Sequence, residues 1–243
     1  MRGPVLSLLM KPRIAIFWHG LFFLGSPPEL SAIAMHISCE QMDMLHESGL
    51  LSAADKFVVG LNGGVETGNI ASLLIPSKAE IVLHGLQSKS ENLTLVLLEN
   101  WIKTIPDDEE WYVLYFHAKG CTWPINDSMR APWRSCMNHH LITNWRQCVS
   151  DLHGVESVGC HWCVPPRTPE TQYYWAGNFF WARSSFLKTL PSIYERQRIK
   201  DSGIDSLESR FESEVWIGNG PRRPTVKDYC PDWWVGKRHR SIY

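Results

Sequence analysis

The chain has 243 residues, 44% of them hydrophobic and 20% charged, values that are ordinary for a globular protein with a sizeable core. Its 24 Lys and Arg nearly balance 25 Asp and Glu, and the formal net charge of -1 excludes a global field toward nucleic acid or an anionic membrane. The first apolar run, 5–10, is too short to span a bilayer and lacks the pattern of a secretion signal, so we expect a cytoplasmic protein.

The first half of the chain alternates predicted strands with predicted helices. The apolar run 14–18 predicts a buried strand that opens into a loop at His19. Apolar residues at roughly helical spacing predict a helix over 28–49, and Gly49 stands where a C-cap belongs. The remaining elements of this half are a strand from residue 56 with a glycine-rich exit, a strand over 79–84, an amphipathic helix over 90–105 that Pro106 stops, and a strand over 111–116.

The second half has a less regular pattern. It predicts one long helix over 133–152, a strand over 155–160, a proline-rich loop over 163–171, an aromatic strand that runs into a helix over 173–190, and a helical piece from residue 213. The tail over 219–243 is irregular and rich in Gly, Pro, Trp and basic residues. Because the sequence has neither an internal repeat nor a linker, we predict a single domain over 1–243.

Strands that alternate with helices favour an α/β fold with a doubly wound, mainly parallel sheet flanked by helices. Ligands of such folds bind beyond the carboxyl ends of the strands. We therefore expect His19, after the first strand, Asn62 and Gly63, after the second, and the loop over 88–92 to contact the base and ribose of a nucleotide. None of these loops carries a phosphate-loop or dinucleotide fingerprint, and the glycine pair also suits a simple tight turn.

Three segments carry motifs that are weak singly and stronger in combination. They read L-Y-F-H-A-K-G-C-T over 114–122, Y-W-A-G-N-F-F-W-A over 174–182 and R-F-E-S-E-V-W-I-G over 210–218. In this order and spacing they resemble the motifs of a family of small GT-A-like glycosyltransferases and related viral and microbial proteins. The resemblance covers about residues 14–218. It implies a GT-A-like fold and the transfer of a sugar from a nucleotide diphosphate donor, with a UDP-sugar as first candidate.

The resemblance also implies roles for particular residues. His117 and Lys119 would neutralise the diphosphate, and Glu214 would act as general base, with Glu212 as the second candidate. The sugar and acceptor would be contacted by Gly177, Asn178, Trp175 and Trp181. Simpler interpretations stay open, since the first pair also suits a loop salt bridge, Gly-Asn a tight turn, and the glutamates a helix N-terminus.

A catalytic metal is not predicted from the residues. Many GT-A enzymes hold a divalent ion on an Asp-x-Asp motif at the end of a central strand, whereas the corresponding exit here is His117-Ala118-Lys119. We expect an ammonium and an imidazole to replace part of the metal's charge. A requirement for Mn or Mg therefore stays open. The acidic run 107–110 precedes the strand and is typical of a solvated turn.

The cysteines and the tail allow two other interpretations. The seven cysteines lack the spacing of a disulfide framework, but Cys160-His161-Trp162-Cys163 lies near Cys136, His139, His140 and Cys148 in sequence, which leaves a structural zinc site open. The basic and aromatic tail suits a non-catalytic sugar- or nucleic-acid-binding module. For an enzyme, the hydroxyl acceptor is open among a glycan, a lipid and a hydroxymethylated DNA base.

Overall fold

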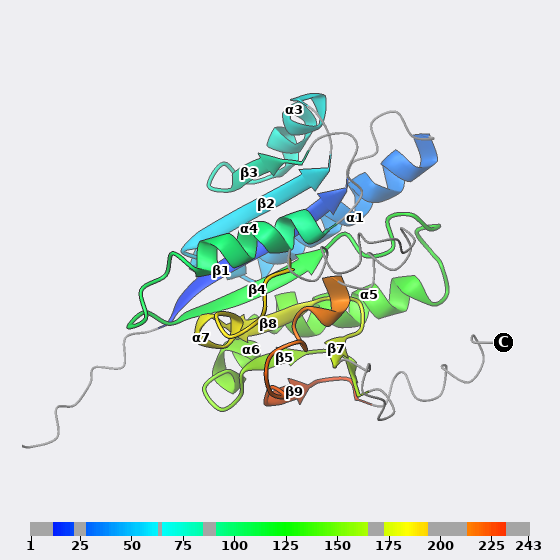
Figure 1. Ribbon diagram of the computed structural model, residues 1–243. Helices are drawn as coiled ribbons and strands as arrows, with labels where there is room; N and C mark the ends of the chain where they lie inside the picture. The colour runs from blue at the N-terminus through cyan, green and yellow to red at the C-terminus, as the bar shows by residue number, and fades with distance from the viewer. Residues whose placement is uncertain are drawn as a thin grey trace, which may run out of the picture.

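A computed structural model describes residues 12–21, 28–62, 65–84, 91–164, 173–193 and 213–231. A seven-stranded sheet in the order β3-β2-β1-β4-β8-β5-β9 forms its centre (Figure 1). The strands are β1 Arg13–Leu21, β2 Lys56–Asn62, β3 Glu80–Leu83, β4 Trp111–His117, β5 Ser157–Gly159, β8 Phe180–Arg183 and β9 Val226–Asp228, and a separate pair joins β6 Trp162–Cys163 to β7 Tyr174–Trp175. The helices are α1 Pro28–Glu47, α2 Leu50–Ala53, α3 Val65–Leu74, α4 Asn92–Ile102, α5 Arg130–Asn138, the π-helical η1 His139–Thr143, α6 Trp145–Asp151 and α7 Ser184–Leu187.

Strand direction divides the sheet into two parts. β3, β2, β1 and β4 run parallel to one another, β8 is antiparallel to both β4 and β5, and β9 is parallel to β5. The predicted α/β class, with a mainly parallel sheet flanked by helices, is confirmed. The carboxyl ends of β1, β2 and β4 meet at one edge, where His19 stands in register with Gly60 on one side and His117 on the other.

The alternation of side chains along the strands builds two apolar layers. In β1, Ile14, Ile16 and Trp18 join one buried cluster, and Ala15 and Phe17 join the other. The same period of two in β4 sends Tyr112, Leu114 and Phe116 to the first cluster and Trp111, Val113 and Tyr115 to the second. Both faces of the central strands are therefore covered, as a parallel sheet requires.

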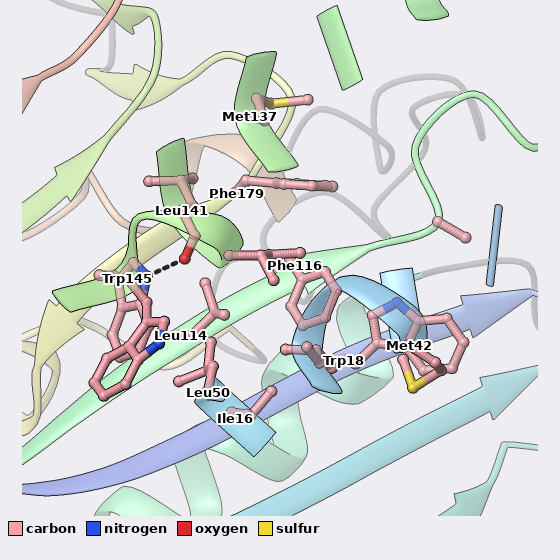
Figure 2. Packing of buried hydrophobic residues seen from close by; sticks show 14 of the residues in the cluster. Ile16, Trp18, Met42, Leu50, Leu114, Phe116, Met137, Leu141, Trp145 and Phe179 are labelled. Atoms are coloured by element: carbon pink, nitrogen blue, oxygen red, sulfur yellow. Dashed lines mark hydrogen bonds between the residues drawn. The ribbon is translucent and has the colours of Figure 1, made fainter. Parts of the chain in front are cut away.

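Different helices supply the two layers. Residues of α1, α2, α5, η1 and α6 complete the first cluster, in which Met42 lies beside Trp18 and Leu50 beside Ile16 (Figure 2). Residues of α4 and α7 complete the second. α4 crosses one face of the sheet while α1 and α5 lie behind it (Figure 1). Within the described residues, no helix has both the length and the apolar content needed to cross a membrane.

The predicted helix over 133–152 is wrong in one respect, because it is interrupted. α5, η1 and α6 follow one another instead, and η1 is a π-helical turn. The carbonyl of Leu141 accepts a hydrogen bond of 2.8 Å from the indole N–H of Trp181 in the neighbouring strand β8. A side chain that hydrogen-bonds to a helix carbonyl competes with the helix's own backbone hydrogen bonds and is a known cause of local helix distortion. The sequence also gave no indication of α3, β6 or β9.

Candidate active site at the carboxyl end of the sheet

The three motif segments lie against one another in the folded chain. His117 Nε2, at the end of β4, donates to the carbonyl oxygen of Gly177 over 2.8 Å. The ammonium of Lys119 lies 3.4 Å from Glu214 Oε1, although 95 positions separate the two residues. A backbone bridge pairs Tyr173 with Gly218, which joins the second segment to the third. Segments that are far apart in sequence thus meet at the exit of β4.

Lys119 is held by contacts on several sides. Its side chain is 11% exposed, that of Glu214 is 17% exposed, and the ammonium also lies 4.5 Å from the centre of the Trp133 ring. Its carbonyl oxygen accepts a hydrogen bond of 3.3 Å from Arg134, whose guanidinium in turn pairs with Glu40 of α1 at 3.3 Å. A partly desolvated ion pair is electrostatically stronger than one in water, so these contacts fix the position of the charge.

The N-terminus of α4 contributes a second acidic group. Glu91 directly precedes this helix, and its Oε2 lies 3.7 Å from His117 Nε2 and accepts the Tyr115 hydroxyl at 3.1 Å. Burial, followed by the negative charge of Glu91, raises the pKa of Tyr115 well above its usual value, so the phenol stays protonated and donates. The hydroxyl of Ser213 hydrogen-bonds to Asn92 at the start of α4, which places the helical turn over 213–215 beside it.

The Gly177-Asn178 turn has an unusual backbone and an unusual side chain. Gly177 and Asn178 have φ values of 90° and 55°, in the left-handed region that glycine and asparagine tolerate best. The Asn178 side chain is completely buried, and no described residue hydrogen-bonds to either its amide nitrogen or its amide oxygen. A buried amide without partners costs about 1–3 kcal/mol per group, which makes this side chain a candidate for binding a ligand.

The structure assigns Trp175 and Trp181 to the core and not to a sugar-binding surface. Both side chains have no exposed area. The indole N–H of Trp175 donates to the Ser157 hydroxyl over 2.9 Å, and that of Trp181 donates to Leu141. With their faces packed and their polar atoms satisfied, these rings have no free surface for a sugar. The sequence suggested otherwise because aromatic residues serve cores and carbohydrate sites equally well.

A buried polar group lies at the ends of β1 and β2. His19 Nδ1 is 2.7 Å from the Thr94 hydroxyl, and the Asn62 amide donates to His19 Nε2 over 3.3 Å, which puts the ring proton on Nδ1. His84 Nε2 lies 3.0 Å from the same hydroxyl. Burial first, and then the neighbouring His117 and His84, hold the pKa of His19 well below its usual value. His19 is therefore a neutral, positioned hydrogen-bonding group.

Some of the predicted positions lie outside the described residues. These are Glu212, Gly63, residues 88–90 and the part of the basic tail from residue 232 onward. Glu91 lies in the loop over 88–92 that the sequence placed at this edge, whereas Thr94 and His84 were not predicted and approach the predicted residues only in the folded chain. The available signal was their location at the end of a predicted strand and the start of a predicted helix.

One group of potential metal ligands is separate from these residues. Among the described residues, Cys136, His161 and Cys230 are the set of three or more whose ligand atoms all lie within 4.8 Å of one another. The zinc set considered from sequence differs, because His139 contacts Asn144. The Cys148 thiol is also engaged elsewhere, donating to the carbonyl of His140.

Comparisons with known proteins give one family and several distant structural likenesses. A family model described as "Domain of unknown function (DUF8361)" matches residues 26–236. The comparison with curated proteins gives no match. Among solved structures, a protein of Desulfovibrio desulfuricans G20 provisionally described as a nucleotide-diphospho-sugar transferase is similar with a TM-score of 0.47 and 9% identity, over 90% of this chain and 80% of that one.

Two further structures are similar at lower scores. A 4-diphosphocytidyl-2C-methyl-D-erythritol synthase of Anaerococcus prevotii DSM 20548 has a TM-score of 0.43 and 10% identity, over 90% of this chain and 87% of that one. Rv0371C of Mycobacterium tuberculosis H37Rv, in complex with manganese, has a TM-score of 0.38 and 11% identity, over 94% and 97%. Likenesses at these scores and identities carry no functional conclusion for this chain.

Proposed function

Because the chain belongs to the DUF8361 family, a domain of unknown function, we propose its activity from its own residues. The activity is transfer of a sugar from a nucleoside diphosphate donor, with a UDP-sugar as first candidate, to a hydroxyl acceptor. The observation that carries the proposal is the 3.4 Å pairing of Lys119 with Glu214 beside the turn whose Gly177 carbonyl is held by His117. A cation (Lys119), a carboxylate (Glu214) and the Gly177-Asn178 turn thus lie at one edge of the sheet.

In the proposed reaction, Lys119 and His117 bind the donor's diphosphate. Its negative charge competes with Glu214 for the ammonium of Lys119, since both are anions that the same cation would pair with. Donor binding therefore frees the Glu214 carboxylate to accept the proton of the acceptor hydroxyl. The acceptor oxygen forms a bond to the sugar's anomeric carbon while the bond from that carbon to the diphosphate oxygen breaks. The nucleoside diphosphate leaves with the electron pair.

Asn178 is the proposed contact to the sugar ring, and because its side chain is completely buried, this contact requires the residues that cover it to move when the donor binds. Both atoms of its buried amide have no partner among the described residues, and an amide offers the donor and acceptor that sugar hydroxyls require. The neighbouring Gly177 lets the turn pack closely against Met137 and Trp133, whose side chains would lie 2.9 and 3.0 Å from an added β-carbon. We assign the nucleoside to the edge formed by His19 and Asn62. The neutral imidazole and the amide there are uncharged hydrogen-bonding groups, as suits a base or a ribose.

The residues at the exit of β4 are a poor match for a divalent metal. Mg²⁺ and Mn²⁺ favour several carboxylate oxygens, whereas the described carboxylates here, Glu91 and Glu214, each lie beside a basic side chain, His117 or Lys119. In the proposed reaction the charge of the diphosphate is therefore met by side chains, and no step depends on a metal.

A donor-hydrolysis assay over a panel of UDP-, GDP-, ADP-, TDP- and CMP-sugars tests the proposal without knowledge of the acceptor. We expect slow release of the nucleotide from one of the diphosphate donors, with water as the acceptor. The proposal is wrong if no donor turns over and no nucleoside diphosphate binds. If the protein instead binds DNA or RNA with steep salt dependence and without donor turnover, the binding-module interpretation replaces it.

Two variants separate binding from chemistry. Lys119→Met should weaken donor binding by about 10- to 100-fold, which corresponds to the loss of a charge-assisted hydrogen bond. Glu214→Gln should lower kcat by about 10²–10⁴-fold while donor binding is unchanged or tighter, because the competitor for Lys119 is gone. Glu109→Gln is the matched control, since Glu109 is an exposed carboxylate that pairs with Arg13 near the amino end of β4. Retained turnover in Glu214→Gln would rule out its assignment as base.

A further inference from the structure

A second cluster with chemical potential joins three segments far from one another in sequence. Cys136 lies on α5, His161 follows β5, and Cys230 follows β9. Their ligand atoms all lie within 4.8 Å of one another, and the sulfurs of Cys136 and Cys230 are 2.8 Å apart. Two thiols and an imidazole form a ligand set that favours zinc over harder cations such as Mg²⁺.

Cys160 offers a fourth thiol beside the cluster, although it is not in the set whose ligand atoms all lie within 4.8 Å of one another. Its side chain is completely buried, and its thiol is a hydrogen-bonding neighbour of both Cys136 and Cys230. Structural zinc sites in proteins are almost always tetrahedral and closed by four Cys or His ligands. The set of Cys136, Cys160, His161 and Cys230 has this composition.

The backbone around the cluster is organised by one carboxylate. Asp228 Oδ1 accepts the N–H groups of His161 and Cys230 over 2.8 and 2.9 Å, and its Oδ2 accepts that of Trp162 over 2.7 Å. His161 has a φ of 64°, a conformation that costs a histidine about 1 kcal/mol or more and persists only where the surroundings enforce it. Two separate segments are thereby held in a fixed relation before any ligand is bound.

The orientation of the imidazole also suits metal binding. His161 Nδ1 lies 3.0 Å from the carbonyl oxygen of Cys230, so this nitrogen carries the proton and donates it. The lone pair then belongs to Nε2. Metal-binding histidines almost always donate their other ring N–H to a carbonyl or carboxylate in this way, which fixes the tautomer and the ring.

We propose that the chain binds one structural Zn²⁺ through Cys136, Cys160, His161 and Cys230. With Zn–S bonds of about 2.3 Å, two sulfurs on a tetrahedral zinc lie about 3.8 Å apart, so the Cys136 and Cys230 sulfurs separate by about 1 Å on binding. The site ties the segment after β9 to α5 and to the end of β5. Since no part of this rests on sugar transfer, the zinc site stands or falls independently of the proposed function.

The site also supports the region around Lys119. Trp133 lies about one turn before Cys136 on α5, its ring is 6.3 Å from that of His161, and the ammonium of Lys119 lies 4.5 Å from the centre of the same ring. A zinc ion that fixes α5 would therefore fix the ring on which the Lys119 charge rests. Its role there is positional, because it contacts neither Lys119 nor Glu214.

Metal analysis of the full-length protein, purified under reducing conditions with zinc in the medium, tests the proposal. We expect one zinc per chain by mass spectrometry. Cys136→Ser and Cys230→Ser should each lose the metal and lower the thermal midpoint. Cys39→Ser should keep both, because Cys39 is a similarly half-buried thiol outside the cluster. Zinc retained in full by both cluster variants would overturn the assignment.

A second measurement does not depend on whether the variants fold. Wild-type protein loaded with Co²⁺ should show the sulfur-to-cobalt charge-transfer and intense ligand-field bands of a tetrahedral thiolate site. Absence of these bands, together with absence of zinc, would overturn the proposal. So would an intact mass lower by two hydrogens with a Cys136–Cys230 disulfide in the metal-free protein, since a disulfide would consume two of the proposed ligands.

Discussion

The two parts of the central sheet are stabilised in different ways. The parallel part depends on long apolar strands, with nine residues in β1 and seven in β4, whose side chains fill both layers of the core. The mixed part has β5 and β9, each of three residues, and carboxylates that collect hydrogen bonds from distant segments. Glu110 binds Arg183, Ser184 and Ser185, and Glu156 binds Arg222 and Thr225. Burial of apolar side chains therefore stabilises the parallel part, whereas hydrogen bonds and ion pairs to buried or half-buried carboxylates stabilise the mixed part.

The largest expected effect is in the parallel part. Leu114→Ala empties a side chain with no exposed area in β4, between β1 and β8, and should cost about 3–4 kcal/mol. The thermal midpoint should fall by roughly 10 °C, measured by calorimetry or circular dichroism. Leu73→Ala is the matched control, because the Leu73 side chain is 83% exposed, and it should change the free energy of unfolding by less than about 0.5 kcal/mol. Equal losses in the two variants would contradict the role given to burial.

The same division explains most of what the sequence could predict, although β5 of the mixed part was also predicted, as a strand over 155–160. β1, β2, β3, β4 and α4 were predicted close to their observed bounds, because each carries its own apolar period or stop signal. β9 and β6 have two or three residues and no period, so their pairing is set by distant partners such as Asp228. Local pattern does not contain that information.

The candidate site shows the same contrast between local signals in the sequence and contacts that only the fold creates. His117, Lys119 and Gly177-Asn178 stood out because a strand exit and a glycine-asparagine pair are visible in sequence. The contacts that relate them, such as Lys119 with Glu214, span 95 positions and follow only from topology. The Cys136–Cys230 approach, across 94 positions, was invisible for the same reason. Cys136, Cys160 and His161 were among the zinc candidates in the sequence, whereas Cys230 was not.

An intermediate effect is expected at the junction of the two parts. Glu110 precedes β4 and accepts hydrogen bonds from the start of α7 and the end of β8, so Glu110→Gln should cost about 1.5 kcal/mol at pH 7. Burial alone would raise the pKa of Glu110, but hydrogen bonds from Ser185, Arg183 and Ser184 outweigh it and the pKa is lowered. A carboxyl with a lowered pKa in the folded state stabilises the protein above its usual pKa, and this contribution is lost as pH falls through the folded value.

The pH dependence gives this prediction its sharpest form. Urea unfolding at pH 7 should separate wild type from Glu110→Gln, and the gap should narrow toward pH 3 as the wild-type carboxyl becomes protonated. Glu109→Gln, at the neighbouring exposed carboxylate, should show little gap at either pH. A gap that is constant from pH 7 to pH 3 would mean that the Glu110 carboxylate charge does not anchor the mixed part.

The smallest expected effect compares two glycines that end helical segments, one before each part of the sheet. Gly49, in the turn between α1 and α2, has a φ of 73°, and an added β-carbon would lie 3.5 Å from the Arg146 guanidinium without a clash, so Gly49→Ala should cost about 1 kcal/mol from backbone conformation alone. Gly154, before β5, has no left-handed φ and its nearest neighbour would be 3.7 Å from an added methyl, so Gly154→Ala should be neutral or stabilise by about 0.5 kcal/mol. Chemical denaturation of both variants measures the difference. Equal changes in the free energy of unfolding would show that the left-handed conformation of Gly49 does not fix the turn that leads into β2. The register of the parallel part would then depend on burial of its strands alone.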